Sequence, residues 1–284
     1  MKLLLLFISL FTLSAHGQKL PQVNFNHFYM VIDSSDLSAI LKSEFINNKF
    51  APILSRTTKA DSEVIWTGIY LFGLDNYFEI FDSSGIGEPS GNIGIGLSVD
   101  RIGEIKQLDT LFAKKYKTET SLRVKKFDEK KIPWFNELDI VDSSFYSQSH
   151  IFLWVMEYRP EYFDYNNWKY YDNKLKRTTY LSPYAEERKG KILEEFTGIT
   201  LRTTGKEKIF LSNFLLNCGY KQIDHTSFAS PENFVFHFVN RNKNEHYPVA
   251  YVEFKSNLSC TGTEKISDNI QIVFHNDTGK IFFK

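Results

Sequence analysis

The sequence predicts an α+β protein built from repeated βαβββ modules, whose antiparallel or mixed sheets form a cup with helices on the outer face. Three observations support this class. Aromatic residues make up 16% of the chain, and such side chains favour strands. The order of one strand, one helix and several strands occurs three times, which indicates duplicated modules. The runs of consecutive strands argue against a doubly wound parallel sheet.

Residues 1–17 have the pattern of a secretory signal peptide. Met1-Lys2 supplies a positive charge, Leu3 to Leu13 is apolar, and Ala15-His16-Gly17 offers small residues for cleavage before Gln18. The alternative is an N-terminal membrane anchor, but the apolar run is shorter than the ~20 residues that span a bilayer. We therefore expect a secreted or periplasmic protein that has no membrane attachment after cleavage.

The charge composition of the chain argues against a nucleic-acid partner. Lys plus Arg and Asp plus Glu are balanced at 34 each, so the chain has no electrostatic reason to bind nucleic acid. The two cysteines, Cys218 and Cys260, allow either one disulfide in an oxidising compartment or two separate thiols. Their spacing excludes a zinc knuckle.

The first module begins with a strand at Asn24 to Ile32, in which Phe25, His27, Tyr29 and Val31 alternate onto one face. Asp33 starts a helix that we expect to end near residue 47. Three further strands are expected, near Ile53 to Thr57, at Val64 to Leu71 and at Tyr77 to Phe81.

The second module repeats this order. Ile93 to Val99 is a strand and Asp100 leads into a helix, and strands are expected at Ser121 to Phe127 and at His150 to Tyr158. Residues 159–195 then form an aromatic-rich insertion. This insertion either lines a ligand pocket or packs against the sheets, and aromatic side chains more often form core.

A third module follows the insertion. Phe196 to Arg202 is a strand, Lys206 to Asn217 is a helix, and Gly219 is placed to cap that helix. Strands are expected at 234–239, 249–254, 270–274 and 281–283. The predicted organisation is thus a signal peptide at 1–17, modules 1 and 2 at 18–158, the insertion at 159–195 and a third βαβββ-like module at 196–284.

The chain from residue 24 to about 115 resembles the vicinal oxygen chelate superfamily, which includes glyoxalases, bleomycin-resistance proteins and extradiol dioxygenases. The strand NHFYMVI before a D-S-S helix start resembles the first strand and helix of that group. YFEIF resembles its strand that ends in an acidic ligand, and GIGLSVD resembles the start of its second module. As a whole, the chain resembles an exported glyoxalase-like branch.

This resemblance implies a cup that holds one divalent metal ion, either zinc, manganese, nickel or iron. His27 and Glu79 would be two of its ligands, and imidazole and carboxylate suit these metals. The strand pattern agrees, because Glu79 lies on one face with Tyr77 and Phe81. Without a metal, Glu79 is a candidate catalytic acid–base group, because burial raises the pKa of a carboxyl group.

The second module departs from the family pattern. Gly94 stands where the family places another histidine, and Glu157 lies on the strand face opposite His150 and Trp154. His150 replaces the missing ligand only if the chain is arranged differently from the family. Two ligands are fewer than the three that catalytic metal sites use. The alternative is that His27 and Glu79 form a hydrogen-bonded or ionic pair across the sheet.

The function remains open between two main classes. One is an enzyme that acts on a small oxygenated molecule, and the other is a non-catalytic protein that sequesters a small, aromatic ligand. An exported structural domain is a third, weaker interpretation. The sequence contains no G-x-S-x-G, P-loop or H-E-x-x-H motif, so the common hydrolase, nucleotide triphosphatase and metalloprotease signatures are missing.

Overall fold

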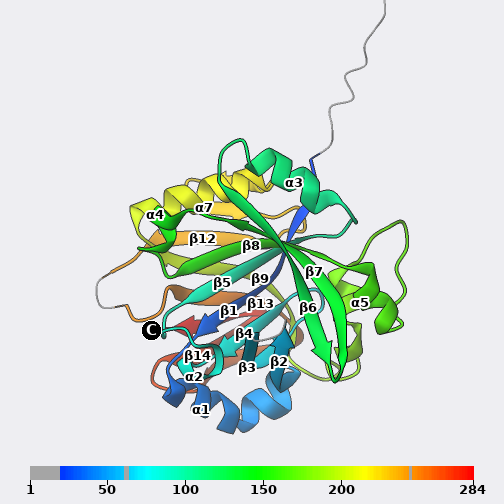
Figure 1. The fold of residues 1–284 in the computed structure, drawn as a ribbon. Coiled ribbons are helices and arrows are strands. Elements are labelled where there is room, and N and C mark those ends of the chain that lie inside the picture. The colour runs from blue at the N-terminus through cyan, green and yellow to red at the C-terminus, as the bar shows by residue number, and fades with distance from the viewer. Residues whose placement is uncertain (1–19, 61–63, 243–244) are drawn as a thin grey trace, which may run out of the picture.

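Two β-sheets form the frame of the protein: a closed eight-stranded barrel and an open six-stranded sheet that packs against it (Figure 1). The computed structural model describes residues 20–284, apart from 61–63 and 243–244. The predicted signal peptide therefore lies outside the described residues. The α+β class with repeated βαβββ modules is confirmed.

The barrel consists of two βαβββ modules. The elements of the first are β1 (Val23–Val31), α1 (Ser34–Lys42), β2 (Ile53–Ala60), β3 (Val64–Phe72) and β4 (Tyr77–Phe81). Those of the second are β5 (Ile93–Val99), α3 (Glu104–Phe112), β6 (Thr118–Phe127), β7 (Lys130–Ile140) and β8 (Ile151–Tyr158). In each module the first strand lies parallel to the fourth, which gives the barrel order β1-β4-β3-β2-β6-β7-β8-β5.

The two modules meet along two lines. On one side β1 pairs antiparallel with β5, from Val23–Val99 to Met30–Ile93. On the other side β2 lies next to β6, and within the described residues Ala60 pairs with Lys125. These two junctions close the barrel.

The open sheet also begins with a βαβββ unit. Its elements are β9 (Leu193–Thr203), α7 (Gly205–Asn217), β10 (Lys221–Asp224), β11 (Ser227–Ala229) and β12 (Val235–Asn240). β9 again lies parallel to the fourth strand of its unit. The hairpin of β13 (Val249–Lys265) and β14 (Ile270–Phe283) then adds to β9, so the order is β10-β11-β12-β9-β13-β14.

Short helices fill the connections. Near the barrel these are η1 (Ile46–Phe50), α2 (Ser83–Ile86) and α4 (Ser143–Tyr146). The insertion contains α5 (Pro160–Tyr165), α6 (Arg177–Tyr180) and η2 (Ser182–Tyr184), and α5 lies against β7 (Figure 1). The aromatic residues of the insertion thus belong to a folded segment.

Several boundaries differ from the prediction. The first helix ends at Lys42, and a π-helix follows it. β7 was not predicted, because Lys130, Lys131 and Pro133 interrupt its apolar alternation. β10 was not predicted because its side chains are all exposed, and β11 is only a short strand. β14 is one strand where two were predicted, since it continues through the turn-like sequence around Asn276.

A bulge in β1 changes one predicted face. The pairing register with β5 shifts between Phe25 and His27. Phe25 consequently leaves the barrel interior and stacks on Phe234 of the third module, with ring centroids 3.6 Å apart. His27 and Tyr29 remain on the inner face, as predicted. A bulge of this kind re-aims side chains locally.

Two hydrophobic clusters follow from this arrangement. The larger cluster lies between the outer face of the barrel and the open sheet, where Phe28 stacks on Phe78 at 4.1 Å and both rings contact Phe196. The second cluster fills much of the barrel interior with tyrosine, tryptophan and phenylalanine side chains. Glu79 shares this inner space, because β4 directs Tyr77, Glu79 and Phe81 to it.

Two further findings concern the predicted environment. Among the residues that the structure describes, no helix combines the length and apolar character needed to cross a membrane. Cys218 and Cys260 are free thiols, so of the two alternatives the structure has the unbonded one.

Candidate functional site

The interior of the barrel holds a cavity of about 610 Å³. This volume lies in the range of sites for small organic molecules. Three of the four tryptophans in the chain, Trp66, Trp134 and Trp154, line it from β3, β7 and β8. The predicted residues His27 and Glu79 also line it, so the structure brings these two together.

His27 is a neutral imidazole held in a fixed orientation. Its ring stacks on Tyr77 with centroids 4.6 Å apart and meets the edge of Trp154 at 5.4 Å. Nδ1 lies 2.8 Å from the side-chain oxygen of Asn26. Burial lowers the pKa of His27 to about 3, so the ring stays uncharged at neutral pH. No described residue hydrogen-bonds to Nε2, which leaves a lone pair for a molecule in the cavity.

Glu79 is a carboxyl group enclosed by aromatic side chains. It pairs with Tyr29 across the β1–β4 ladder, and its half-buried side chain lines the cavity. Burial raises the pKa of Glu79 to about 8, although Arg56, Lys125 and a hydrogen bond from Tyr77 oppose this rise. The group is therefore mostly a neutral carboxylic acid at pH 7, and such a group both donates and accepts hydrogen bonds.

Lys125 lies behind this part of the wall, and the sequence analysis did not identify it. Burial lowers the pKa of its ammonium group to about 7, with a smaller contribution from Arg56. Nζ lies 4.6 Å from the centre of the Trp134 ring and donates a hydrogen bond to the Tyr162 hydroxyl at 3.1 Å. Only the strand alternation of β6 would have pointed to an inward lysine.

The sequence analysis also missed an acidic group at the β6–β7 side of the cavity. Glu119, Glu137 and Asp139 line the wall together with Arg123. Arg123 forms two bonds to Glu137, Nε to Oε2 at 2.5 Å and Nη2 to Oε1 at 3.1 Å. Burial and the adjacent Glu137 raise the pKa of Asp139 to about 7. Asp139 consequently changes charge near neutral pH.

The structure does not bring His150 to the cavity. Its side chain is exposed, and Nδ1 lies 2.9 Å from the side-chain oxygen of Asn92. Asn92 in turn donates to Glu88, which also accepts a bond from the Tyr29 hydroxyl at 3.0 Å. His150 therefore contacts the site only through this hydrogen-bonded chain. Glu157 lies on the outer face of the barrel, where it is buried and accepts a hydrogen bond from the backbone N–H of Ile105 in α3.

The donor set does not fit the expected metal centre. A Cβ atom at Gly94 would lie 2.0 Å from the ring of Tyr29, and one at Gly96 would lie 2.7 Å from the ring of His27. Aromatic rings thus fill the space where the family pattern requires a second-module ligand. Within the described residues, no three His, Cys, Asp or Glu side chains are grouped to hold a metal. A proton on Glu79 would also compete with any metal ion.

The insertion packs against strands of the barrel. Tyr180 stacks on Tyr158 with centroids 4.8 Å apart, and Tyr184 stacks on Phe72 at 3.7 Å. Trp168 packs against Tyr180 and its neighbours. None of the described residues of 159–195 lines the cavity. Tyr162, Phe163 and Tyr180 of the insertion are buried core, whereas Tyr165 and Tyr171 are exposed. The insertion thus packs against the sheets, the second of the two alternatives that the sequence left open.

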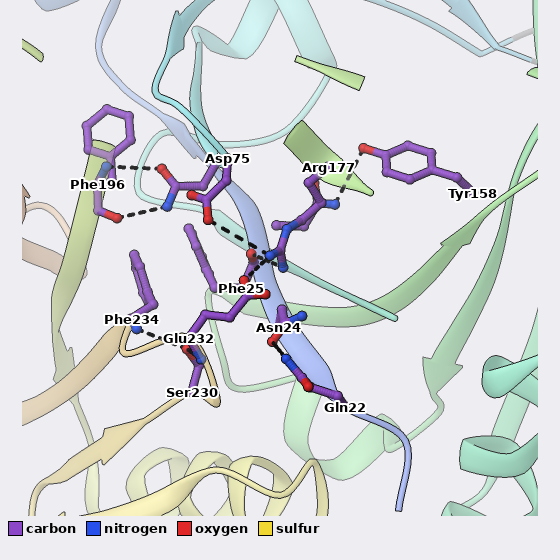
Figure 2. A network of polar contacts seen from close by, with 12 residues as sticks. Gln22, Asn24, Phe25, Asp75, Tyr158, Arg177, Phe196, Ser230, Glu232 and Phe234 are labelled. Carbon is purple, nitrogen blue, oxygen red and sulfur yellow. Dashed lines mark hydrogen bonds and ion pairs between the residues drawn. The ribbon is translucent and has the colours of Figure 1, made fainter. Parts of the chain in front are cut away.

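A second polar cluster joins the barrel to the open sheet (Figure 2). Arg177 is buried, donates to the carbonyl oxygen of Phe25 at 2.9 Å and forms ion pairs with Glu232 and Asp75. Next to it the side chain of Asn76 bonds both the N–H and the C=O of Phe196, at 3.0 and 2.8 Å. These contacts position the two sheets and leave the cavity as the candidate site.

A sequence model of the family of unknown function DUF5829 matches residues 25–282. The chain belongs to this family. No curated protein matches the sequence. Among solved structures, the family member described here is similar to a hypothetical protein from Staphylococcus aureus, with a TM-score of 0.48 and 10% identity over 78% of this chain and 87% of that one. It is also similar to the Mn(II)-bound glyoxalase from Novosphingobium aromaticivorans, with a TM-score of 0.38 and 9% identity over 82% and 64%.

Proposed function

We propose that the protein binds a small organic molecule in the barrel cavity. The observation that carries this proposal is the 610 Å³ space with three tryptophans in its wall. Ligand sites are typically apolar and aromatic hollows with a few polar groups that fix orientation. His27 and Glu79 are such groups, because each presents a hydrogen-bonding atom to the cavity.

The two groups favour an oxygenated ligand. Neutral His27 accepts a hydrogen bond at Nε2, since its Nδ1 is engaged with Asn26. Protonated Glu79 donates one, since its pKa is raised to about 8 by burial. A hydroxyl group next to a carbonyl group satisfies both, with the hydroxyl on His27 and the carbonyl on Glu79.

Tryptophan indole signals test the binding proposal. In the ¹⁵N-labelled full chain, a small-molecule library that includes hydroxyketones and phenols is added while the four indole N–H resonances are recorded. A ligand in the cavity shifts Trp66, Trp134 and Trp154 and leaves Trp168, which packs in the insertion, as an internal control. A Trp→Phe variant at each site assigns the signals. The proposal is wrong if no compound shifts the three signals, or if every ligand shifts Trp168 alone.

Metal-free proton transfer is a second candidate function, and the raised pKa of Glu79 favours it. Deprotonated Glu79 is a base matched to neutral pH, which suits removal of a proton from carbon next to a carbonyl group. Bound compounds would then exchange that proton in D₂O, at a rate that rises with pH to a plateau above about 8.

Glu79→Gln is the matched variant for this second candidate. We expect it to keep ligand binding and to slow the exchange by roughly 10²-fold or more, the usual contribution of a general base. If the carbon-bound proton of every ligand exchanges no faster than in buffer alone, the proton-transfer function is contradicted and the binding function remains.

We also propose that the cup operates outside the cytoplasm, on the strength of the leader pattern at residues 1–17. Cell fractionation of the full chain and of a form lacking residues 2–17 tests this. The first should appear in the exported fraction and the second in the cytoplasm. Equal distribution of the two forms would contradict export by this segment.

A further inference from the structure

The charged side chains of the cavity wall are strongly unequal in sign. Among the described residues, five carboxyl groups line the cavity, at Glu79, Glu88, Glu119, Glu137 and Asp139. Of the described lysine and arginine side chains, Arg123 lines it, and its guanidinium group bonds Glu137. The negative charges at the β6–β7 side therefore exceed the positive charge available to balance them.

Two of these carboxyl groups stand next to an aromatic surface. Glu119 pairs with Asp139 across β6 and β7, and Asp139 pairs with Trp154 across β7 and β8. Directly paired residues project from the same face of a sheet. The row continues through Trp154 to the ring of His27. A flat group on Trp154 thus has carboxylates at one end and the neutral polar groups His27 and Glu79 at the other.

Arg123 lowers the pKa of Asp139, but burial and the adjacent Glu137 outweigh it. Lys117 lies 3.8 Å from Glu119, but both side chains are mostly exposed, so that ion pair contributes little. The groups that face Asp139 are Glu137, Glu119, Arg123 and Tyr146. Like charges at short range disfavour ionisation, and a cation placed between them removes that cost.

We infer that the ligand of this cavity is an organic cation, an amine or guanidinium group carried on a flat apolar body. The cationic group lies against Glu119 and Asp139, and the body lies against Trp154 and the other indole rings. Aromatic faces attract cations as well as apolar groups, so both parts of the wall favour the same ligand. An anionic ligand meets repulsion from the same carboxylates. This inference rests on the proposed binding function.

Three compounds with one indole body and different charge test the ligand class. Tryptamine is a cation, tryptophol is neutral and indole-3-propionate is an anion. Titration calorimetry with the full chain at pH 7 and low salt should give a Kd for tryptamine about tenfold below that for tryptophol, with indole-3-propionate weakest. Of the three compounds, only tryptamine should bind more weakly when salt is added, because salt screens the attraction between its charge and the carboxylates.

Proton release supplies an independent readout. A bound cation lowers the pKa of Asp139, which near neutral pH is partly protonated, so tryptamine binding releases protons and tryptophol binding does not. Calorimetry in two buffers of different ionisation enthalpy measures the number of protons released on binding. Asp139→Asn should raise the Kd of tryptamine about tenfold, abolish the release and leave tryptophol within about twofold.

Glu119→Gln is a second variant that keeps the test valid if Asp139→Asn folds poorly, because the Glu119 side chain is exposed. It should also weaken tryptamine selectively. Glu186→Gln, which changes an exposed carboxyl group in the insertion, is the matched control and should change nothing.

The outcomes separate this inference from the binding function. If tryptophol binds as tightly as tryptamine and shifts the cavity indoles, the cation inference is overturned and the binding function stands. A preference for indole-3-propionate has the same consequence. If none of the three compounds binds, the inference is overturned, and the indole signals with the wider library decide the binding function separately.

Discussion

The barrel and the open sheet begin with the same βαβββ unit, in which the first strand lies parallel to the fourth. In the barrel a second complete module faces the first, and the eight strands close around the cavity. In the open sheet the hairpin β13–β14 takes the place of a second module. Its outer face carries His237 and Glu253, which remain partly exposed and pair with each other at 3.8 Å.

This difference indicates what creates the site. In the open sheet this face stays partly exposed, and Glu253 also forms an ion pair with Lys280 at 2.8 Å. Closure by a second module encloses the corresponding face, so that Glu79 titrates near neutral pH and His27 stays uncharged. The chemistry of the cup therefore comes from pairing of modules rather than from the module itself.

Phe196→Ala should have the largest effect, because it breaks the contact between the two regions. Phe196 is buried and touches Phe28 and Phe78 of the barrel. Truncation of such a ring costs about 3–5 kcal/mol of unfolding free energy. Urea denaturation followed by circular dichroism measures it. Ile209→Ala on the exposed face of α7 is the control and should cost far less. Equal losses would mean that the two regions do not depend on this contact.

Glu79→Gln sharpens the comparison through pH. The folded pKa of about 8 lies above the usual 4.5, so the stability that the protonated carboxyl contributes is complete below pH 4.5 and is lost as pH rises to 8. Glutamine cannot ionise, so the variant should gain about 3 kcal/mol over the wild type at pH 7. Urea unfolding at pH 4.5, 7 and 9 checks this. At pH 4.5 the two proteins should be equally stable, and a constant difference across pH would contradict the raised pKa.

Gly94→Ala tests the close packing inside the barrel. The new Cβ would lie 2.0 Å from the Tyr29 ring and 2.7 Å from Trp154, so these rings must move. Overpacking of this kind costs about 1–3 kcal/mol. Gly205→Ala at the start of α7 is the matched control, because no atom lies within 4 Å of its Cβ position. Thermal unfolding of the two variants distinguishes them, and a stable Gly94→Ala would show that the interior has spare room.

Thr204→Ala should have the smallest effect and tests how the helices of the two regions begin. Thr204 and Glu207 form a capping box on α7, with bonds of 3.2 and 2.8 Å. α3 begins after Gly103 without a side-chain cap of its own, and Glu157 of β8 accepts from its backbone instead. Loss of the Thr204 cap should cost about 1 kcal/mol, and Thr204→Ser should restore most of it. Chemical denaturation detects both.

Much of the fold follows from local patterns. The alternation in β1, β4 and β8 predicts the strands and also the inner faces of His27 and Glu79. The bulge at Phe25 is not readable, because it depends on pairing with β5. β7 was not predicted, because Pro133 and the lysines of the strand weaken its apolar alternation. In the structure its backbone pairs with β6 and β8.

The site was predictable only in part. His27 and Glu79 come from adjacent strands of one module, so a family-like strand pattern is enough to bring them together. Glu137 and Arg123 meet only through the β6–β7 register, which the sequence does not specify without β7. His150 precedes β8, and its side chain contacts Asn92 instead of turning into the barrel. The alternation of a strand therefore does not predict the direction of a side chain just outside that strand.

The junction of β1 with β5 bears on how steadily the cavity wall is held. It is an antiparallel ladder from Val23–Val99 to Met30–Ile93 with one bulge after Phe25. The edge strand β10 of the open sheet has four residues, all of them exposed. Local unfolding free energy follows the number of such bonds and the burial around them, so amide hydrogens of β1 should exchange with solvent more slowly than those of β10. The strand that carries His27 and Tyr29 therefore stays in place while the edge of the open sheet opens and closes.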